Sequence, residues 1–241
     1  MILLDASGGA PPPGTFGVII ARSLAGDILF ARASLLIASL GPDMVASHAR
    51  TFERLCEGQL NETFGPTDGV DRVDFYLQVL ADKTGSLVSA AASFGALLAG
   101  AGSLVSDVLA EFGEKVGVAF QIADDVLDLA SSGEQSGKTP GTDLREGVDT
   151  LPVLLLRRRE AAGTIDQAGE RILRDLSGDL SSDEALASVV EQLRCHDVLG
   201  ETRELARTWA DDAVATLAPL PKGEPKKALE AFAHLMVDRL A

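Results

Sequence analysis

Three aspartates and one glutamine interrupt an otherwise apolar segment, Gly117–Ala130 (GVAFQIADDVLDLA). Gln121, Asp124, Asp125 and Asp128 have the spacing i, i+3, i+4 and i+7, which places them along one stripe of a helix. Carboxylates on adjacent turns repel one another unless a cation lies between them, and hard oxygen ligands suit Mg²⁺. The stripe therefore predicts a metal site at the three aspartates. The alternative is a helix whose single polar face meets solvent.

Single polar residues also interrupt apolar rows in three other helical patterns, at Lys83, Gln59 and Asp27. For any one of them a structural role is an alternative, because a lysine can extend its ammonium to water and a buried glutamine can hydrogen-bond locally. Several helices of one chain with this feature predict a polar pocket inside a helix bundle.

Helical periodicity continues from about Phe16 onward and period-two alternation is nowhere sustained, so we expect an all-α protein. Helices are predicted over 16–39, 43–63, 71–99, 103–131, 147–160, 164–176, 183–194, 198–216 and 224–240. Three prolines and three glycines in residues 7–14 predict an irregular tail over 1–15, followed by one helical domain over 16–241. The polar, glycine-rich stretch Ser131–Asp149 predicts a long functional loop.

The composition argues against several kinds of partner. A formal net charge of −15 without a basic cluster makes nucleic acid and anionic lipid unfavourable partners. Residues Gly85–Ser106 carry no charge, but their glycines and serines and the lack of an aromatic belt predict a helix buried in protein, not a transmembrane segment. Cys56 and Cys195 match no zinc or redox spacing, and we expect both to be buried. Without a recognisable signal peptide, these features predict a reducing, cytoplasmic location.

A longer pattern contains these residues. FQIADDVLD (Phe120–Asp128) followed by GKTPGTDLREGVDTLP (Gly137–Pro152) resembles the second aspartate-rich region of trans-isoprenyl (polyprenyl) diphosphate synthases. The resemblance continues upstream through Ala25–Ser34, Glu57–Gln59 and Asp82–Leu87, and it covers nearly the whole chain. DDxxD alone is a weak signal, but the ordered set, with FQ before it and GKxxGxDL after it, is highly specific. The resemblance implies an isoprenoid-synthase-type helix bundle around a central cavity.

The resemblance also implies an activity and roles for named residues. Members of the family use Mg²⁺ to draw pyrophosphate from an allylic diphosphate, and the resulting cation reacts with the homoallylic isopentenyl diphosphate. By position, the resemblance assigns Mg²⁺ to Asp124, Asp125 and Asp128, and catalysis to Lys83, Thr84, Gln121 and Asp124. Substrate contacts are assigned to Gln59, Lys83, Thr84, Phe120, Gln121, Lys138 and Asp143, and residues 86–99 are expected to line the cavity for the growing chain.

A first aspartate-rich motif, DDxxD followed by paired arginines, is expected upstream in this family. Gly9–Pro11 aligns with the end of that region, and Ser7 and Gly8 occupy the positions of the arginines. On this alignment the chain is expected to lack the motif and the first helices of the bundle. It could then be a truncated synthase, a non-catalytic partner of an intact synthase, or a prenyl-diphosphate-binding protein without turnover. A homodimer or heterodimer is expected to form through 16–39 and 43–63.

Overall fold

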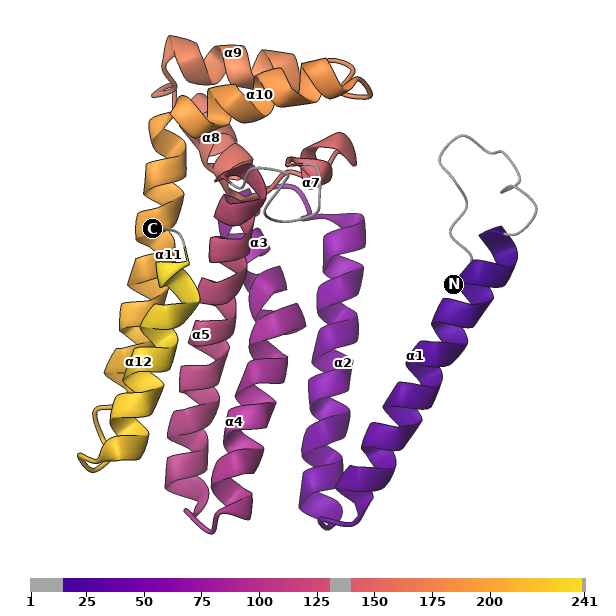
Figure 1. Ribbon diagram of the computed structural model, residues 1–241, viewed down its shortest axis with the longest axis vertical. Helices are drawn as coiled ribbons and strands as arrows, with labels where there is room; N and C mark the ends of the chain where they lie inside the picture. The colour runs from indigo at the N-terminus through magenta and orange to yellow at the C-terminus, as the bar shows by residue number, and fades with distance from the viewer. Residues whose placement is uncertain (1–14, 131–139, 240–241) are drawn as a thin grey trace. The chain divides into compact units, whose positions relative to one another are not determined.

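The computed structural model describes residues 15–130 and 140–239, with side chains from residue 20 onward. Every regular element in these ranges is helical, which confirms the predicted all-α class (Figure 1). Contacts within the chain divide it into two units, residues 1–50 and 51–241. The predicted single domain over 16–241 stays a prediction.

The first unit contains α1 (Thr15–Ala38) and the first half of α2 (Pro42–Phe64). The two helices contact each other through His48 of α2. Its ring stacks on the Phe30 ring of α1, with centroids 5.4 Å apart, and its Nε2 lies 3.3 Å from the hydroxyl of Ser34. Gly41, with a φ of 107°, supplies the left-handed residue in the turn between them.

The described side chains of α1 expose an unusually large apolar surface. Leu24, Ile28 and Leu29 are 55%, 69% and 71% exposed, and Asp27 lies among them on an exposed turn. The apolar row that contains Asp27 is therefore not a buried row in this chain. A contiguous apolar helix surface of this kind normally marks a protein–protein contact.

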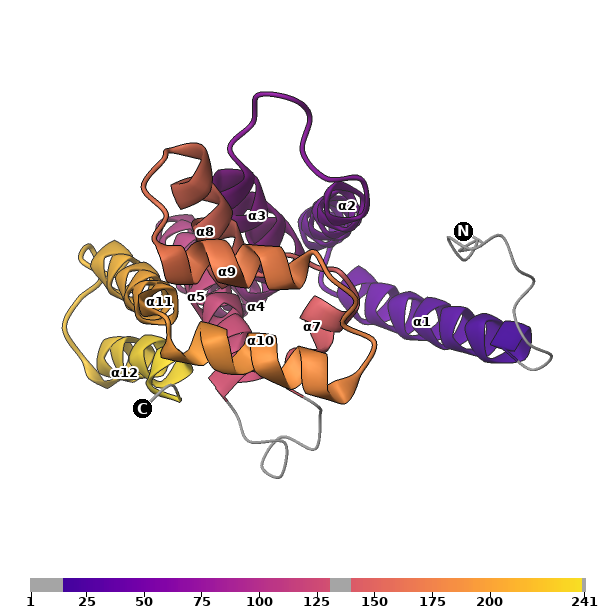
Figure 2. The ribbon, with the colours of Figure 1, turned by 90° about the horizontal axis from the view of Figure 1, so that it is seen from above.

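The second unit is built around the long helix α5 (Ser103–Ala130). Val118, Ala119, Ile122, Ala123 and Val126 of this helix are completely buried, so α5 is apolar on several sides, as a central helix must be. Figures 1 and 2 show the neighbouring helices packed along it. They are α3 (Arg72–Leu80), α4 (Ser86–Leu98), α8 (Leu151–Ala161), α11 (Asp197–Thr216) and α12 (Glu224–Asp238).

Glycines let α4 and the turn before it approach α5 closely. A Cβ added at Gly117 would lie 2.7 Å from the Cα of Gly85, and one at Gly113 would lie 2.7 Å from the carbonyl oxygen of Val88. Side chains larger than hydrogen are therefore excluded from both positions. Gly100 and Gly102, with φ values of 75° and 83°, form the turn that joins α4 to α5, where the sequence predicts it.

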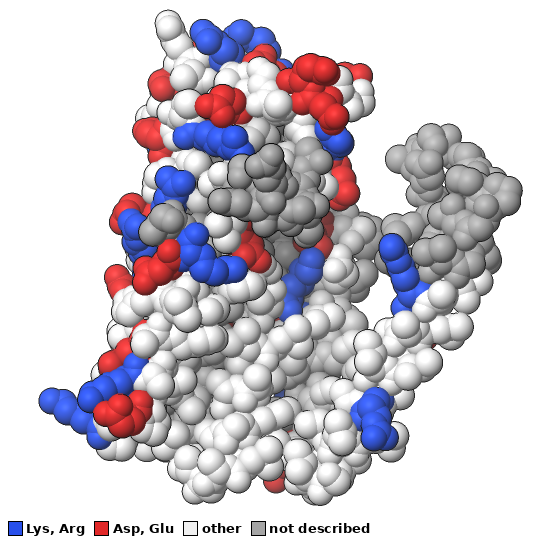
Figure 3. Space-filling view, viewed as in Figure 1, with Lys and Arg blue, Asp and Glu red and all other residues white. Residues whose placement is uncertain are grey.

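The outer surface of α4 is apolar and uncovered in this chain. Leu87, Leu97 and Leu98 are 49%, 41% and 61% exposed, so the expectation that this helix is buried in protein is wrong for that surface. Figure 3 shows uncharged residues over this part of the second unit, whereas acidic and basic residues gather over α8–α10. No helix in the described ranges is both long and apolar enough to cross a membrane.

The helices α9 (Gln167–Leu176) and α10 (Asp183–Cys195) lie across one end of α5 (Figures 1 and 2). The loop predicted over 131–149 contains one helical turn, α7 (Thr142–Arg145), and its residues 131–139 lie outside the described ranges. The helix predicted from 147 begins at Leu151 instead, because Gly147 has a φ of 75° and Thr150 is extended.

Cys56 is only partly buried and Cys195 is exposed, so the expectation that both cysteines are buried is wrong.

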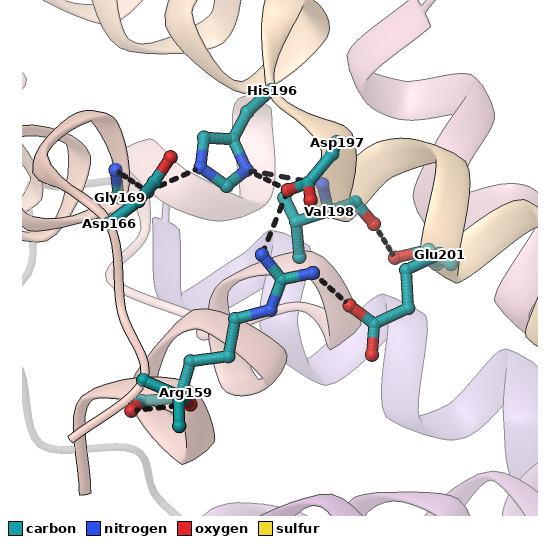
Figure 4. Close-up of polar contacts among 9 residues, drawn as sticks. Arg159, Asp166, Gly169, His196, Asp197, Val198 and Glu201 are labelled. Atoms are coloured by element: carbon teal, nitrogen blue, oxygen red, sulfur yellow. Dashed lines mark hydrogen bonds and ion pairs between the residues drawn. The ribbon is translucent and has the colours of Figure 1, made fainter. Parts of the chain in front are cut away.

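A polar cluster around the buried His196 joins α8, α9 and α11 (Figure 4). It does not include the predicted metal-binding aspartates of α5. His196 caps α11 by accepting a hydrogen bond at Nδ1 from the Val198 amide, and its Nε2 lies 3.0 Å from the Asp166 carboxylate at the start of α9. Arg159 of α8 binds Asp197 at 2.8 Å and also Glu201. The side chain of His196 is only 3% exposed, so this cluster fixes the packing of α8, α9 and α11.

Candidate active site

Asp125 is the most deeply buried of the four aspartates on α5, with 9% exposure. Its Oδ2 accepts hydrogen bonds from the Tyr76 hydroxyl at 2.8 Å and from the Leu151 amide at 3.1 Å. The pKa of Asp125 is raised to about 7: burial is the largest cause, the nearby carboxylates of Asp143 and Asp124 also raise it, and both hydrogen bonds act to lower it. A cation beside Asp125 would relieve this cost.

Tyr76 links Asp125 to two other acidic residues. The loss of water around its hydroxyl raises the pKa of Tyr76, and the negative charges of Asp125, Asp143 and Glu62 add to the shift. Asp143 of α7 and Glu62 of α2 therefore lie within electrostatic reach of the same hydroxyl. The sequence predicted Asp143 but neither Tyr76 nor Glu62. The only signal for Tyr76 is its place seven residues before Lys83 on the same predicted helix.

Lys83 and Thr84 lie on a π-helical turn, η1 (Ala81–Gly85), which interrupts the helix predicted over 71–99. The Lys83 ammonium binds Glu62 at 2.5 Å, and Glu62 also accepts a hydrogen bond from the Gln59 amide at 2.8 Å. The Thr84 hydroxyl donates to the Gln121 Oε1 of α5 at 2.9 Å. Gln59 is exposed, so the interpretation of it as a polar residue in a core row is wrong.

Asp124 has different neighbours from Asp125. Its Oδ1 lies 2.9 Å from Nη2 of Arg239, just beyond α12, and the guanidinium of Arg239 lies 4.5 Å from the centroid of the Phe120 ring. Phe120 and Asp124 therefore contact the C-terminal end of α12, whereas Gln121 and Asp125 face η1 and α3. The single predicted stripe is divided between two sets of neighbours, and no sequence pattern indicates Arg239.

Asp128 binds the backbone just before α7. The amide of Gly141 donates to its Oδ2 at 3.1 Å. Gly141 has a φ of 75°, and a Cβ there would lie 2.6 Å from a methyl group of Val190 in α10. This position therefore requires glycine, and α10 supports the contact from behind. Lys138, predicted to contact substrate, lies outside the described residues.

The carboxylate oxygens of this site suit a hard cation that is also bound by waters and by phosphate oxygens. Across residues 15–130 and 140–239, no group of three His, Cys, Asp or Glu side chains is close enough to hold a metal on its own. Mg²⁺ is commonly bound by one or two carboxylates together with waters and phosphate oxygens of a substrate. Asp124 already pairs with a cationic side chain, and Asp125 is a buried carboxylate whose ionisation a cation would favour. The residues present fit such an ion.

Two hollows on the surface lie apart from these residues. One of about 500 Å³ is lined by α8 and α9 residues such as Ile165 and Arg174, and one of about 400 Å³ lies between the start of α3 and α8. Neither is lined by a predicted site residue. We therefore place the candidate site by the hydrogen bonds and charges around Asp125 and not by these hollows.

Comparison with solved structures identifies this architecture as the helix bundle of isoprenyl diphosphate synthases. Geranylgeranyl pyrophosphate synthase from Corynebacterium glutamicum, crystallised with calcium and isoprenyl diphosphate, matches with a TM-score of 0.79 and 41% identity over 90% of this chain and 66% of its own. A polyprenyl synthase from Caulobacter crescentus matches with the same TM-score and 32% identity, over 92% of this chain and 67% of its own.

The polyprenyl synthetase family model matches residues 15–193, so the chain belongs to this family. Nonaprenyl diphosphate synthase from Mycobacterium tuberculosis is 40% identical over 216 residues, which cover 90% of this chain and 63% of that protein. Octaprenyl diphosphate synthase from Escherichia coli is 33% identical over 91% of this chain and 67% of its own length. The chain thus spans about 63% of the length of the mycobacterial relative.

Proposed function

We propose that this chain carries the diphosphate-binding site of a prenyltransferase that condenses an allylic diphosphate with isopentenyl diphosphate. The observation that carries the proposal is the juxtaposition of the two sides of the site. Gln121 and Asp125 of α5 are hydrogen-bonded directly to Thr84 of η1 and Tyr76 of α3, and Lys83 lies on the same turn as Thr84. An anionic group between them would meet cationic or donor groups from η1 and a carboxylate-bound cation from α5.

Each group has a role in this reaction. Mg²⁺ would be held by one or two carboxylates from Asp124, Asp125 and Asp128 together with waters and phosphate oxygens, and it would neutralise the departing diphosphate. The Lys83 ammonium, released from Glu62, would bind the same diphosphate from η1. Because Gln121 accepts a hydrogen bond from the Thr84 hydroxyl at its Oε1, its amide NH₂ remains a donor for a phosphate oxygen. Gln59, Phe120, Lys138 and Asp143 are proposed as the other substrate contacts.

The apolar surface of α4 is the proposed wall for the growing hydrocarbon chain. The exposed row on this helix starts at Leu87, three residues after Thr84, and continues with Ala91, Gly95 and Leu98. An allylic cation requires a lining without nucleophiles or water, which uncharged side chains provide. The central cavity and the requirement for Mg²⁺ are parts of the proposed prenyltransferase function.

A direct test is to incubate the purified chain with Mg²⁺, farnesyl diphosphate and isopentenyl diphosphate and to separate products by mass. The proposal predicts elongated diphosphates from the unmodified chain and none from the Asp124→Ala variant. Asp107→Ala, at an exposed position of the same helix, is the matched control and should keep full turnover. Turnover by Asp124→Ala would refute the assignment, and no product from the folded, unmodified chain would refute catalysis by this chain alone.

The exposed apolar residues of α1 favour a second candidate function, that of a partner subunit. We propose that α1 and α2 form the contact with a second copy or with an intact synthase, because Ile28 and Leu29 are each about 70% exposed. Light scattering of the pure chain tests the homodimer. Mixing with an intact synthase, followed by size-exclusion chromatography and an activity assay, tests the heterodimer. A monomer in both experiments would contradict this candidate.

A further inference from the structure

Two ion pairs join the π-helical turn η1 to α2, Lys83 with Glu62 and Asp82 with Arg54. Arg54 of α2 donates from Nε to the Oδ1 of Asp82, in η1, at 2.6 Å, and from Nη1 to Glu114 of α5. Asp82 also accepts a hydrogen bond from Gln78 at 3.0 Å, and its side chain is only 11% exposed. The guanidinium therefore joins three elements through two carboxylates, and both interactions raise the pKa of Arg54.

The same turn is compressed between two glycine-bearing helices. Gly58, one turn after Arg54, packs on the turn so closely that a Cβ there would lie 2.8 Å from the Cβ of Asp82. On the opposite side, Gly117 contacts the backbone of Gly85. Close packing at Gly58 and Gly117 leaves the orientation of η1 to the groups at its edges, and Arg54 is the one that binds Asp82 there.

A π turn also needs such support because of its geometry. The Ser86 amide donates to the Ala81 carbonyl, five residues back, so the turn holds one more residue than an α-helical turn. Relaxation to an α-helical register would rotate the residues on one side of the turn by about 100° relative to those on the other. The neighbouring Lys83 and Thr84, which now point to Glu62 and Gln121, would lose this arrangement.

We propose that Arg54 is a positioning residue that orients Lys83 for diphosphate binding by fixing Asp82 in the π turn. This inference rests on the proposed function, because it assigns Arg54 a part in the same site. Arg54 itself contacts neither the carboxylates of α5 that are assigned to Mg²⁺ nor Thr84. Its effect on a bound diphosphate should therefore pass through Lys83.

The test is a double-mutant cycle measured by calorimetry, with inorganic pyrophosphate as the probe and saturating Mg²⁺. Arg54→Gln should weaken pyrophosphate binding about tenfold, the lower end of the effect of removing a group that orients a ligand. In a Lys83→Gln background the same change should have almost no further effect, because the two residues act as one unit. Arg50→Gln, one turn earlier on α2 and exposed, is the matched control and should bind pyrophosphate as the unmodified chain does.

The outcomes separate this inference from the proposed function. Equal weakening by Arg54→Gln with and without Lys83 would show a general structural role and would overturn the positioning role. Unchanged binding by Arg54→Gln would also overturn it. If Arg54→Gln does not fold, Arg54→Lys replaces it in the cycle; it keeps the charge but cannot reach both carboxylates, so intermediate affinity is expected. An unmodified chain that binds no pyrophosphate would refute the proposed function and the positioning role together.

Discussion

Replacing Asp125 with asparagine should stabilise the protein at neutral and higher pH, although it removes a residue of the candidate site. Both hydrogen bonds to Asp125, from Tyr76 and from the Leu151 amide, end on the same oxygen, Oδ2. The Oδ1 of an asparagine can occupy that place and accept both. The substitution thus removes a buried charge without removing a hydrogen-bond acceptor.

The magnitude follows from the pKa of Asp125, which is raised from 3.8 to about 7. The folded chain binds this proton more tightly than the unfolded chain does, so the contribution of Asp125 to the free energy of unfolding falls as the pH rises from about 4 to about 7. At about 1.4 kcal/mol per pH unit, the ionised carboxylate costs about 4 kcal/mol above this window. Asp125→Asn should therefore equal the unmodified chain near pH 4 and exceed it by up to about 4 kcal/mol near pH 8.

Urea unfolding followed by circular dichroism across this pH range, with EDTA present, measures the difference. Asp107→Asn on the same helix is exposed and should change the free energy of unfolding by less than about 0.5 kcal/mol throughout. A difference between Asp125→Asn and the unmodified chain that does not vary with pH would refute the reasoning. So would an Asp125→Asn variant that is less stable near pH 8.

Three further predictions concern other contacts. Gly117→Ala should lower the free energy of unfolding by about 2 kcal/mol or more, because its Cβ would meet the backbone of Gly85, and an unchanged urea midpoint would contradict this. His196→Ala should lower the free energy of unfolding by about 2–3 kcal/mol in the same assay, because a helix cap and buried contacts are lost. A decrease below about 0.5 kcal/mol would show that the His196 cluster does not stabilise the fold. Arg239→Gln should tighten Mg²⁺ binding severalfold in calorimetry, because the cation paired with Asp124 no longer competes, and equal or weaker binding would argue against that competition.

The helices were largely predictable because glycine and proline separate them and the apolar period is regular. Gly41 and Gly100 lie in turns where the sequence placed them. The π turn was not predictable, since the pattern over 71–99 is continuous. Glycines on two other helices, Gly58 and Gly117, contact the turn closely from both sides. Such contacts between distant segments leave no periodic signal.

The candidate site was predictable to the same extent. Spacing placed Gln121 and Asp125 on one side of α5, where hydrogen bonds to Thr84 and Tyr76 join them to α3 and η1. The pairing of Asp124 with a residue 115 positions later could not follow from local spacing. The exposure of Leu87 was mispredicted because an uncharged pattern shows that a surface is apolar but not what covers it.

The position of the aspartates along α5 has a consequence for what can approach them. Asp124, Asp125 and Asp128 lie in the last two turns of a 28-residue helix with no basic residue in its last turn. The partial negative charge of the helix macrodipole is at that end, so the carboxylates and the terminal carbonyls add their potentials, at a cost of about 0.3–1 kcal/mol for an exposed acidic residue there. Under the proposed function, this end of the helix would favour a diphosphate that arrives with its counter-cations over an unaccompanied one.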